Sequence, residues 1–195
     1  MTAREATVER KTKETDVRVE LRLDGSGTAS AETGLPFFDH MLEQLGTHAG
    51  FDLSVRARGD LEVDAHHTVE DVGIALGRAL LEALGDKRGI RRFGSVVVPL
   101  DEAAVEASLD LSGRPFVVHE VDVPAEVIGT FDTGLVEDFV RALATEARMT
   151  LHVRLRSGRS PHHVVEAEFK AIARALGDAV APSGRAGTPS TKGTL

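Results

Sequence analysis

The chain has 195 residues, with 23 Lys and Arg against 31 Asp and Glu, eight His and no Cys. The missing cysteine excludes disulfides, thiolate metal sites and cysteine nucleophiles, and the net charge of −8 argues against non-specific nucleic-acid binding, which draws mainly on Lys and Arg. Short, interrupted apolar runs and a charged N-terminus predict neither a membrane span nor a signal peptide, so we expect a cytoplasmic protein without membrane or nucleic-acid partners.

Hydrophobic periodicity predicts strands and helices in alternation along the chain. Residues 17–23 alternate apolar and charged side chains, as in a half-buried strand, and residues 36–49 have helical spacing with Pro36 at the start. A strand over 52–58 and a helix over about 68–84 follow. The second half repeats this order, with strands at residues 95–100, 104–111 and 116–121, a helix at 132–148, a strand at 150–156 and a helix at 161–181. The alternation predicts an α+β fold, an α/β sandwich with helices on one face of each sheet.

Two copies of an HHxxE pattern indicate an internal duplication. HHTVED begins at His66 and HHVVEA at His162, an offset of 96 residues (162 − 66), and the preceding FDLSV and MTLHV segments are offset by 98 (149 − 51). Helix, strand and motif therefore recur together. We divide the chain into a first repeat at residues 1–90, a second at 91–181 and a tail at 182–195. The tail is rich in Pro, Gly, Ser and Thr, which fits either a disordered end or an ordered arm that touches a ligand.

The histidine pairs point to metal binding. One pair at a helix start usually hydrogen-bonds locally or faces solvent, but two pairs at equivalent places, each followed by glutamate, favour metal ligands. On a helix, His67 and Glu70 lie within about 60° of each other at about 100° per residue, away from the apolar stripe. Adjacent histidines project apart, so two ions fit better than one. Four histidines and two glutamates would give each ion three ligands and leave positions for water or substrate.

The other histidines have weaker local context. His40, in FFDHML, and His152, in TLHV, could add ligands, although the first could instead bond within its helix and the second could face solvent. We expect His48 and His119 to be structural or exposed. Imidazole and carboxylate without thiolate suit Zn, Mn, Fe, Co or Ni.

Together with both HHxxE copies, the segments FFDHMLEQLGTHAGFDL, LDLSGRP and STKG resemble the imidazoleglycerol-phosphate dehydratase family of histidine biosynthesis. The resemblance extends from VERKTKETDV to PSTKG. It implies a tandem duplication of a unit with a four-stranded sheet and two helices on one face, the ribosomal protein S5 domain 2-like fold. It also implies homo-oligomers, trimers that assemble into a 24-mer, with two Mn²⁺ ions per active site held by residues of different subunits.

The same resemblance assigns residues by motif. The implied metal ligands are His40, His66, His67, Glu70, His152, His162, His163 and Glu166. The catalytic candidates are Glu14, Glu166 and His67. The implied substrate contacts are Glu14 and Gln44, with Arg92, Arg114, Lys170, Ser190 and Lys192 at the phosphate.

The implied reaction removes water from D-erythro-imidazoleglycerol phosphate and gives imidazole acetol phosphate. The proton that leaves carbon is hardly acidic because no carbonyl adjoins it. Our hypothesis is that two Mn²⁺ ions hold the substrate's imidazole as imidazolate, whose electrons push out the hydroxyl. Glu14 is the candidate for moving the carbon-bound proton, the alternative being a solvated residue in the charged run 11–16.

Two other functions stay open from the residues alone. One is a dinuclear metallohydrolase, in which the ions activate water. The other is a non-catalytic metal-binding assembly, whose histidines store metal or join subunits. The basic candidates favour an enzyme that acts on a small phosphorylated imidazole, because Arg and Lys suit phosphate oxygens.

Overall fold

The computed structural model describes residues 3–123 and 126–193. Its first sheet contains β1 (Glu5–Lys11), β2 (Thr15–Arg22), β3 (Ala29–Glu32) and β4 (Asp52–Gly59) in the order β1-β2-β4-β3. The β1–β2 and β2–β4 pairs are antiparallel, whereas β3 runs parallel to β4. Two helices, α1 (Pro36–Ala49) and α2 (His66–Leu84), accompany this sheet.

The second half repeats this arrangement. The sheet has the order β5-β6-β10-β7, formed by β5 (Phe93–Leu100), β6 (Ala103–Asp110), β7 (Phe116–Glu120) and β10 (Thr150–Ser157). Its first two pairs are antiparallel and β7 runs parallel to β10. Its helices are α3 (Leu135–Glu146) and α4 (Pro161–Val180), and a small hairpin of β8 (Val127–Ile128) and β9 (Phe131–Asp132) precedes α3. The repeated pattern confirms the predicted fold class.

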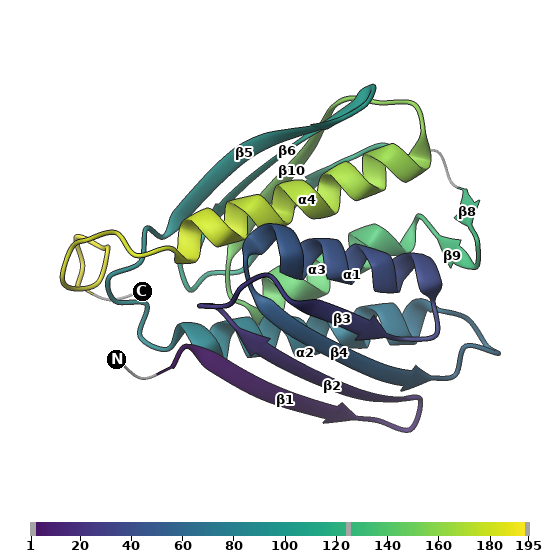
Figure 1. Ribbon diagram of the computed structural model, residues 1–195, viewed down its shortest axis with the longest axis horizontal. Helices are drawn as coiled ribbons and strands as arrows, with labels where there is room; N and C mark the ends of the chain where they lie inside the picture. Colours follow the sequence, from purple (N-terminus) through teal and green to yellow (C-terminus); the bar gives the residue numbers. More distant parts are fainter. Residues whose placement is uncertain (1–2, 124–125, 194–195) are drawn as a thin grey trace.

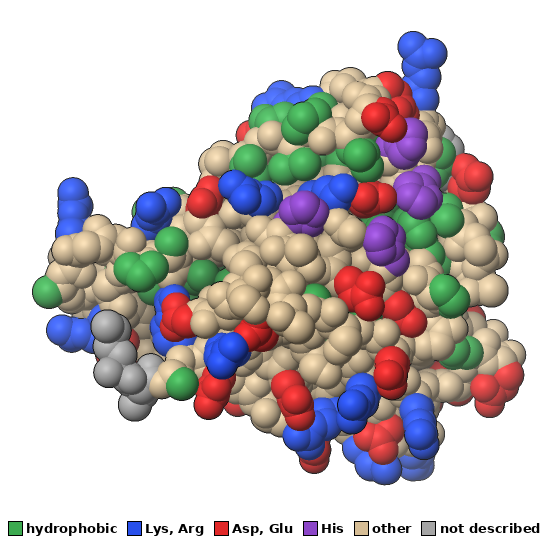
Figure 2. Space-filling view, viewed as in Figure 1, with side chains coloured by type: hydrophobic (Ala, Val, Ile, Leu, Met, Phe, Trp, Pro, Cys, Tyr) green, Lys and Arg blue, Asp and Glu red, His purple; other side chains and the backbone are tan. Residues whose placement is uncertain are grey.

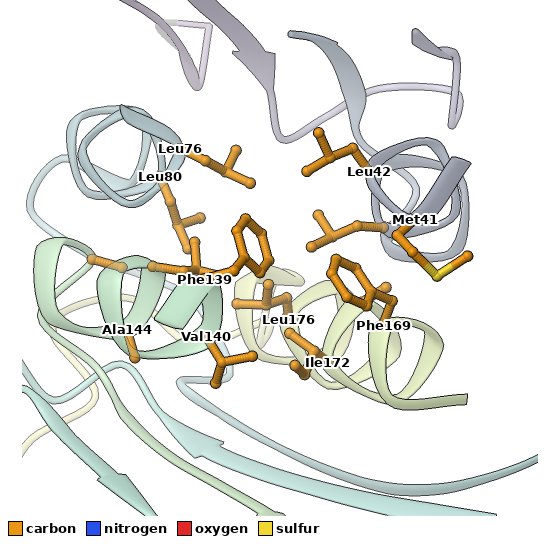
Figure 3. Packing of buried hydrophobic residues seen from close by; sticks show 14 of the residues in the cluster. Met41, Leu42, Leu76, Leu80, Phe139, Val140, Ala144, Phe169, Ile172 and Leu176 are labelled. Atoms are coloured by element: carbon orange, nitrogen blue, oxygen red, sulfur yellow. The ribbon is translucent and has the colours of Figure 1, made fainter. Parts of the chain in front are cut away.

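The four helices lie between the two sheets (Figure 1). Helices α1 and α4 pack together, as do α2 and α3, so each contact joins the two halves of the chain. Aliphatic side chains and phenylalanines from all four helices converge there, among them Leu76, Phe139 and Leu176 (Figure 3). Gly77 allows α2 to approach α3 closely, because a Cβ at this position would lie 2.6 Å from the carbonyl oxygen of Leu143. The shared core fixes the helix ends of both halves relative to each other.

The structure differs from the sequence expectations at a few elements. Helix α2 begins at His66, two residues earlier than predicted, and α3 is shorter at both ends. Strand β1 was missed because Val8 is its one buried residue, and β3 because its four residues, ASAE, alternate only small alanines with polar side chains. The tail contacts the segment before β5, where the Ser183 N–H donates a hydrogen bond to the Gly89 carbonyl at 2.7 Å.

His119 and Glu168 form a buried pair between β7 and α4. The His119 Nε2 lies 2.8 Å from the Glu168 Oε1, and the two side chains are 6 % and 0 % exposed. Glu137 of α3 lies 3.8 Å from the other ring nitrogen. Burial opposes the charged imidazole, but the hydrogen bond to Glu168 and the negative charges of Glu168 and Glu137 together outweigh it and raise the pKa of His119. His119 is therefore structural, one of the two roles expected from the sequence.

We expect His119→Ala to lower the free energy of unfolding by about 3–5 kcal/mol, because it leaves the buried Glu168 carboxylate without its partner. Since folding raises the pKa of His119, the pair stabilises fully below the unfolded pKa of about 6.5 and loses this effect as pH rises through the folded pKa. Urea unfolding at fixed protein concentration, followed from pH 6 to 9, measures both effects. Equal pH profiles of the unfolding free energy for wild type and His119→Ala would contradict the assignment. The double variant with His119→Phe and Glu168→Leu should recover most of the stability.

Candidate active site

The first turns of α2 and α4 hold the two histidine pairs. Helix α4 begins with Ser160 as its N-cap, whose hydroxyl accepts the His163 N–H, and with Pro161 at the first helical position. The His66 Nε2 lies 3.7 Å from the Glu70 Oε2, and the His162 Nε2 lies 3.2 Å from the Glu166 Oε2. Each glutamate thus contacts the first histidine of its pair, because side chains four residues apart lie one turn apart on one face of a helix.

The second histidine of each pair contacts carboxylates from loops. The His67 Nδ1 lies 3.1 Å from the Asp60 Oδ2, and the His163 Nδ1 lies 2.7 Å from the Glu102 Oε2. These hydrogen bonds raise the pKa of both histidines. A carboxylate on Nδ1 fixes the ring and directs Nε2 toward a metal, as is common for metal-binding histidines. Asp60 and Glu102 have no signal in the sequence, since acidic residues are common in turns and nothing in their spacing links them to the HHxxE motifs.

Two glutamates occupy corresponding hairpin turns but differ in their surroundings. Glu102, between β5 and β6, accepts hydrogen bonds from the backbone N–H groups of Ser160 and Arg159 as well as from His163, and these lower its pKa to about 2. Glu14, between β1 and β2, is exposed, and its Oε2 lies 4.0 Å from the His67 Nδ1. Glu102 is thus a fixed anion, whereas the carboxylate of Glu14 is exposed beside the first histidine pair.

A second group of predicted residues lies on α1 and α4. The Glu166 Oε1 accepts a hydrogen bond from the Lys170 ammonium at 2.6 Å. Burial opposes the ionisation of Glu166, but Lys170 and His162 outweigh it, and with nearby His40 they hold its pKa below the ordinary value. On α1, the Gln44 Oε1 lies 2.9 Å from the ring nitrogen of His48. Figure 2 shows histidine side chains gathered over these helices, beside acidic and basic groups.

His152 lies apart from the other predicted ligands. Its neighbours on β10, Leu151 and Val153, are buried under the helices, so the His152 side chain is on the opposite face of the second sheet. There it lines a shallow hollow of about 400 Å³ with Phe93 and Ser108. His152 and the helices that carry the histidine pairs therefore lie on opposite sides of the second sheet.

A basic pocket lies at the other end of α4. Four of the five predicted phosphate residues line this hollow of about 1030 Å³, namely Arg92, Arg114, Ser190 and Lys192. The tail forms one wall, and the Arg92 guanidinium donates a hydrogen bond to the Pro189 carbonyl at 2.8 Å. Arg91 and Arg185, which the sequence analysis did not select, add two more cations to the lining. No carboxylate is among the described lining residues. Asp110 pairs with Arg92 at 2.6 Å, but the other arginines and Lys192 leave the pocket suited to an anion.

The basic pocket and the histidine pairs are far apart within one chain. Pro182 and Ser183, just beyond the last turn of α4, line the pocket, whereas His162 and His163 lie in the first turn of this 20-residue helix, about 30 Å away. Lys170, paired with Glu166, is also separate from the other phosphate candidates. In residues 3–123 and 126–193 no three His, Asp or Glu side chains converge on one metal position. The donors have the chemistry of a divalent-metal site, although the described part of a single chain does not bring three of them together.

Comparison with known proteins agrees with these features. The family model for imidazoleglycerol-phosphate dehydratase matches residues 33–176. Curated imidazoleglycerol-phosphate dehydratases are 63% identical in Parafrankia sp., over 99% of this chain and 100% of the relative, and 59% identical in Symbiobacterium thermophilum, over 96% and 91%. None of the helices in the described ranges is long and apolar enough to cross a membrane.

Solved structures give the same result. The crystal structure of the Staphylococcus aureus imidazoleglycerol-phosphate dehydratase has a TM-score of 0.83 and 37% identity, over 92% of this chain and 99% of that one. The Pyrococcus furiosus IGPD, solved in complex with (S)-C348, has a TM-score of 0.83 and 38% identity, over 96% and 100%. The chain therefore belongs to the imidazoleglycerol-phosphate dehydratase family and is, like its relatives, an enzyme of the hydro-lyase class.

Proposed function

We propose that this chain is a Mn²⁺-dependent dehydratase that converts D-erythro-imidazoleglycerol phosphate into imidazole acetol phosphate in L-histidine biosynthesis, and that its active sites are shared between copies in a cytoplasmic homo-oligomer. The observation that carries the proposal is the combination of an anion pocket with paired histidines and glutamates. The substrate's phosphate would bind in the anion pocket, and its imidazole would bind at the paired histidines and glutamates.

Sharing between copies follows from the dimensions of the chain. Three carbons join the imidazole to the phosphate oxygen in this substrate, which is far too short to span the length of α4. In this proposal the basic pocket of one copy therefore faces the histidine pairs of another. The outer face of the second sheet supports such contacts, because Phe93 and Phe116 are exposed there beside His152. Trimers that assemble into a 24-mer, as the family resemblance implies, would bring these surfaces together.

The residues of the chain have distinct roles in this proposal. His66, Glu70, His162 and Glu166, together with the Nε2 atoms of His67 and His163, would hold the metal ions, and His40 and His152 would complete the shells. When bound, two Mn²⁺ ions would supply Lewis-acid chemistry and hold the substrate's imidazole.

The remaining residues bind and position the substrate. Arg114 offers planar guanidinium donors to the phosphate, and Lys192 adds a point charge. Arg92 adds positive charge to the pocket, with its guanidinium held by Asp110 at 2.6 Å. Gln44 would contact the substrate from α1, and Lys170 would approach the phosphate from the copy that supplies the histidines. Glu14 takes the carbon-bound proton, because its carboxylate is exposed beside His67.

Arg114→Ala should lower kcat/KM by about 10- to 100-fold, since a hydrogen bond to a charged group contributes about 1.5–3 kcal/mol. Arg88→Ala is the matched control, because Arg88 is exposed near the same end of the chain and pairs with Asp86 outside the pocket lining. Steady-state kinetics on both variants measures the difference. Equal kcat/KM for the two would exclude Arg114 from phosphate binding.

The direct test uses purified, assembled protein with Mn²⁺ and imidazoleglycerol phosphate. We expect imidazole acetol phosphate to form and 1,2,4-triazole compounds that carry a phosphonate to compete. A metallohydrolase has no reason to bind these compounds, and a storage protein would bind metal without turnover. Absence of product from metal-loaded, assembled protein would overturn the proposal.

A further inference from the structure

The turn that carries Glu14 is tied to α2 through a buried aspartate. The Thr15 hydroxyl donates a hydrogen bond to the Asp71 Oδ2, and the Arg10 Nε donates to the Asp71 Oδ1 at 2.8 Å. Asp71 and Thr15 are 6 % and 4 % exposed. One carboxylate thus holds β1 through Arg10 and β2 through Thr15, on both sides of the turn.

Further hydrogen bonds within the turn connect the anchored Thr15 to the backbone of Glu14. The Thr12 hydroxyl oxygen accepts the backbone N–H groups of Glu14 at 3.1 Å and Thr15 at 2.9 Å. It also lies 3.1 Å from the Thr15 hydroxyl. The Glu14 backbone is therefore fixed from both sides while its carboxylate extends toward His67.

Asp71 lies four residues after His67 on α2, so both side chains project from the same face of the helix. The tie through Thr15 consequently sets where Glu14 stands relative to His67, whose Nδ1 lies 4.0 Å from the Glu14 Oε2. Resting on the dehydratase function proposed above, we infer that Asp71 is a positioning residue for the proton transfer by Glu14, acting through Thr15 and Arg10.

The second repeat supports the assignment by contrast. The residue 96 positions after Asp71 is Ala167, which is buried and has no polar side chain. The corresponding turn carries Glu102, whose carboxylate is held directly by the N–H groups of Arg159 and Ser160. In the second repeat, backbone N–H groups fix the Glu102 carboxylate directly, and the helix has Ala167 where the first repeat has Asp71. In the first repeat, Asp71 links the turn to α2 and the Glu14 carboxylate stays exposed.

Thr15→Val and Thr15→Ser in the Mn²⁺-loaded assembly test the inference. Valine keeps the branched shape of threonine but cannot donate to Asp71, so we expect kcat to fall by about 10- to 100-fold with KM and bound Mn²⁺ unchanged, since a misplacement of about 1 Å can cost a factor of about 100. Serine retains the hydroxyl and should keep kcat within about threefold of wild type by the same argument. Lys11→Met, an exposed change in the same hairpin, is the control that should not alter kcat.

A combination with Glu14→Gln separates positioning from a merely structural role. If Thr15 and Asp71 act through Glu14, Thr15→Val should change the residual turnover of Glu14→Gln by less than about twofold. A structural role predicts that the two losses multiply. Arg10→Gln, which removes the other bond to Asp71, gives the same comparison should Thr15→Val fail to fold.

Normal kcat for folded Thr15→Val, a change confined to KM or Mn²⁺ content, or multiplied losses would each overturn the inference. All three outcomes require an active wild-type enzyme. Failure of the dehydratase function is distinguishable, because wild-type protein would then form no product.

Discussion

Glu14→Gln should lower kcat by about 10²- to 10⁴-fold while bound Mn²⁺ and the size of the assembly stay unchanged. Glutamine has the shape of glutamate but cannot take the carbon-bound proton at neutral pH. The Glu14 carboxylate is exposed and its contact with His67 is long, at 4.0 Å, so the substitution removes little that stabilises the fold. Turnover at saturating substrate, with metal content measured by atomic emission, checks the prediction.

Glu20→Gln is the matched control for this change. Glu20 projects from the exposed face of β2 in the same hairpin and forms an ion pair with Arg18. An exposed pair of this kind contributes little to stability, so we expect normal turnover. A Glu14→Gln enzyme that turns over as fast as Glu20→Gln would show that another group moves the proton.

The second large effect is expected for His163→Ala, which should weaken Mn²⁺ binding by more than about 100-fold. The substitution removes an imidazole nitrogen, whereas loss of a group that only orients a ligand costs about 10- to 100-fold. We also expect the assembly to dissociate at lower denaturant concentration, since the sites join copies. Equilibrium metal binding and light scattering measure the two effects.

Glu102→Gln is a milder substitution at the same site, for comparison with His163→Ala. Glu102 holds the His163 ring through Nδ1 at 2.7 Å. Its loss should therefore give the smaller decrease in metal affinity, about 10- to 100-fold. If His163→Ala binds Mn²⁺ as tightly as wild type, His163 is not a metal ligand. Glu102 would then not have the proposed role of orienting a ligand.

Much of the fold was predictable because its signals are periodic. Helix α1 has the predicted bounds, since Pro36 begins it and apolar residues follow at helical spacing. The duplication was visible because both copies keep the same motif at the start of a long helix. Strand β3 had no such signal, because its parallel pairing with β4 depends on residues distant in sequence.

The candidate site was less predictable because it depends on tertiary contacts. The spacing within HHxxE located the donors but not their contacts, and the contact between Glu70 and His66 is visible only in the structure. Asp71 could not be recognised as an anchor, since its two partners lie in another part of the chain. The separation of Lys170 from Arg92 and Arg114 likewise requires the length and direction of α4.

Activity of mixed assemblies tests most directly whether active sites are shared between copies. Chains with Glu14→Gln would be co-expressed with chains carrying Arg114→Ala, using two tags to purify assemblies that contain both. If Glu14 and Arg114 of one site come from different copies, random mixing leaves about a quarter of the sites with both residues intact, so activity should return to about a quarter of wild type. Activity no higher than that of the two parent variants would contradict the shared site.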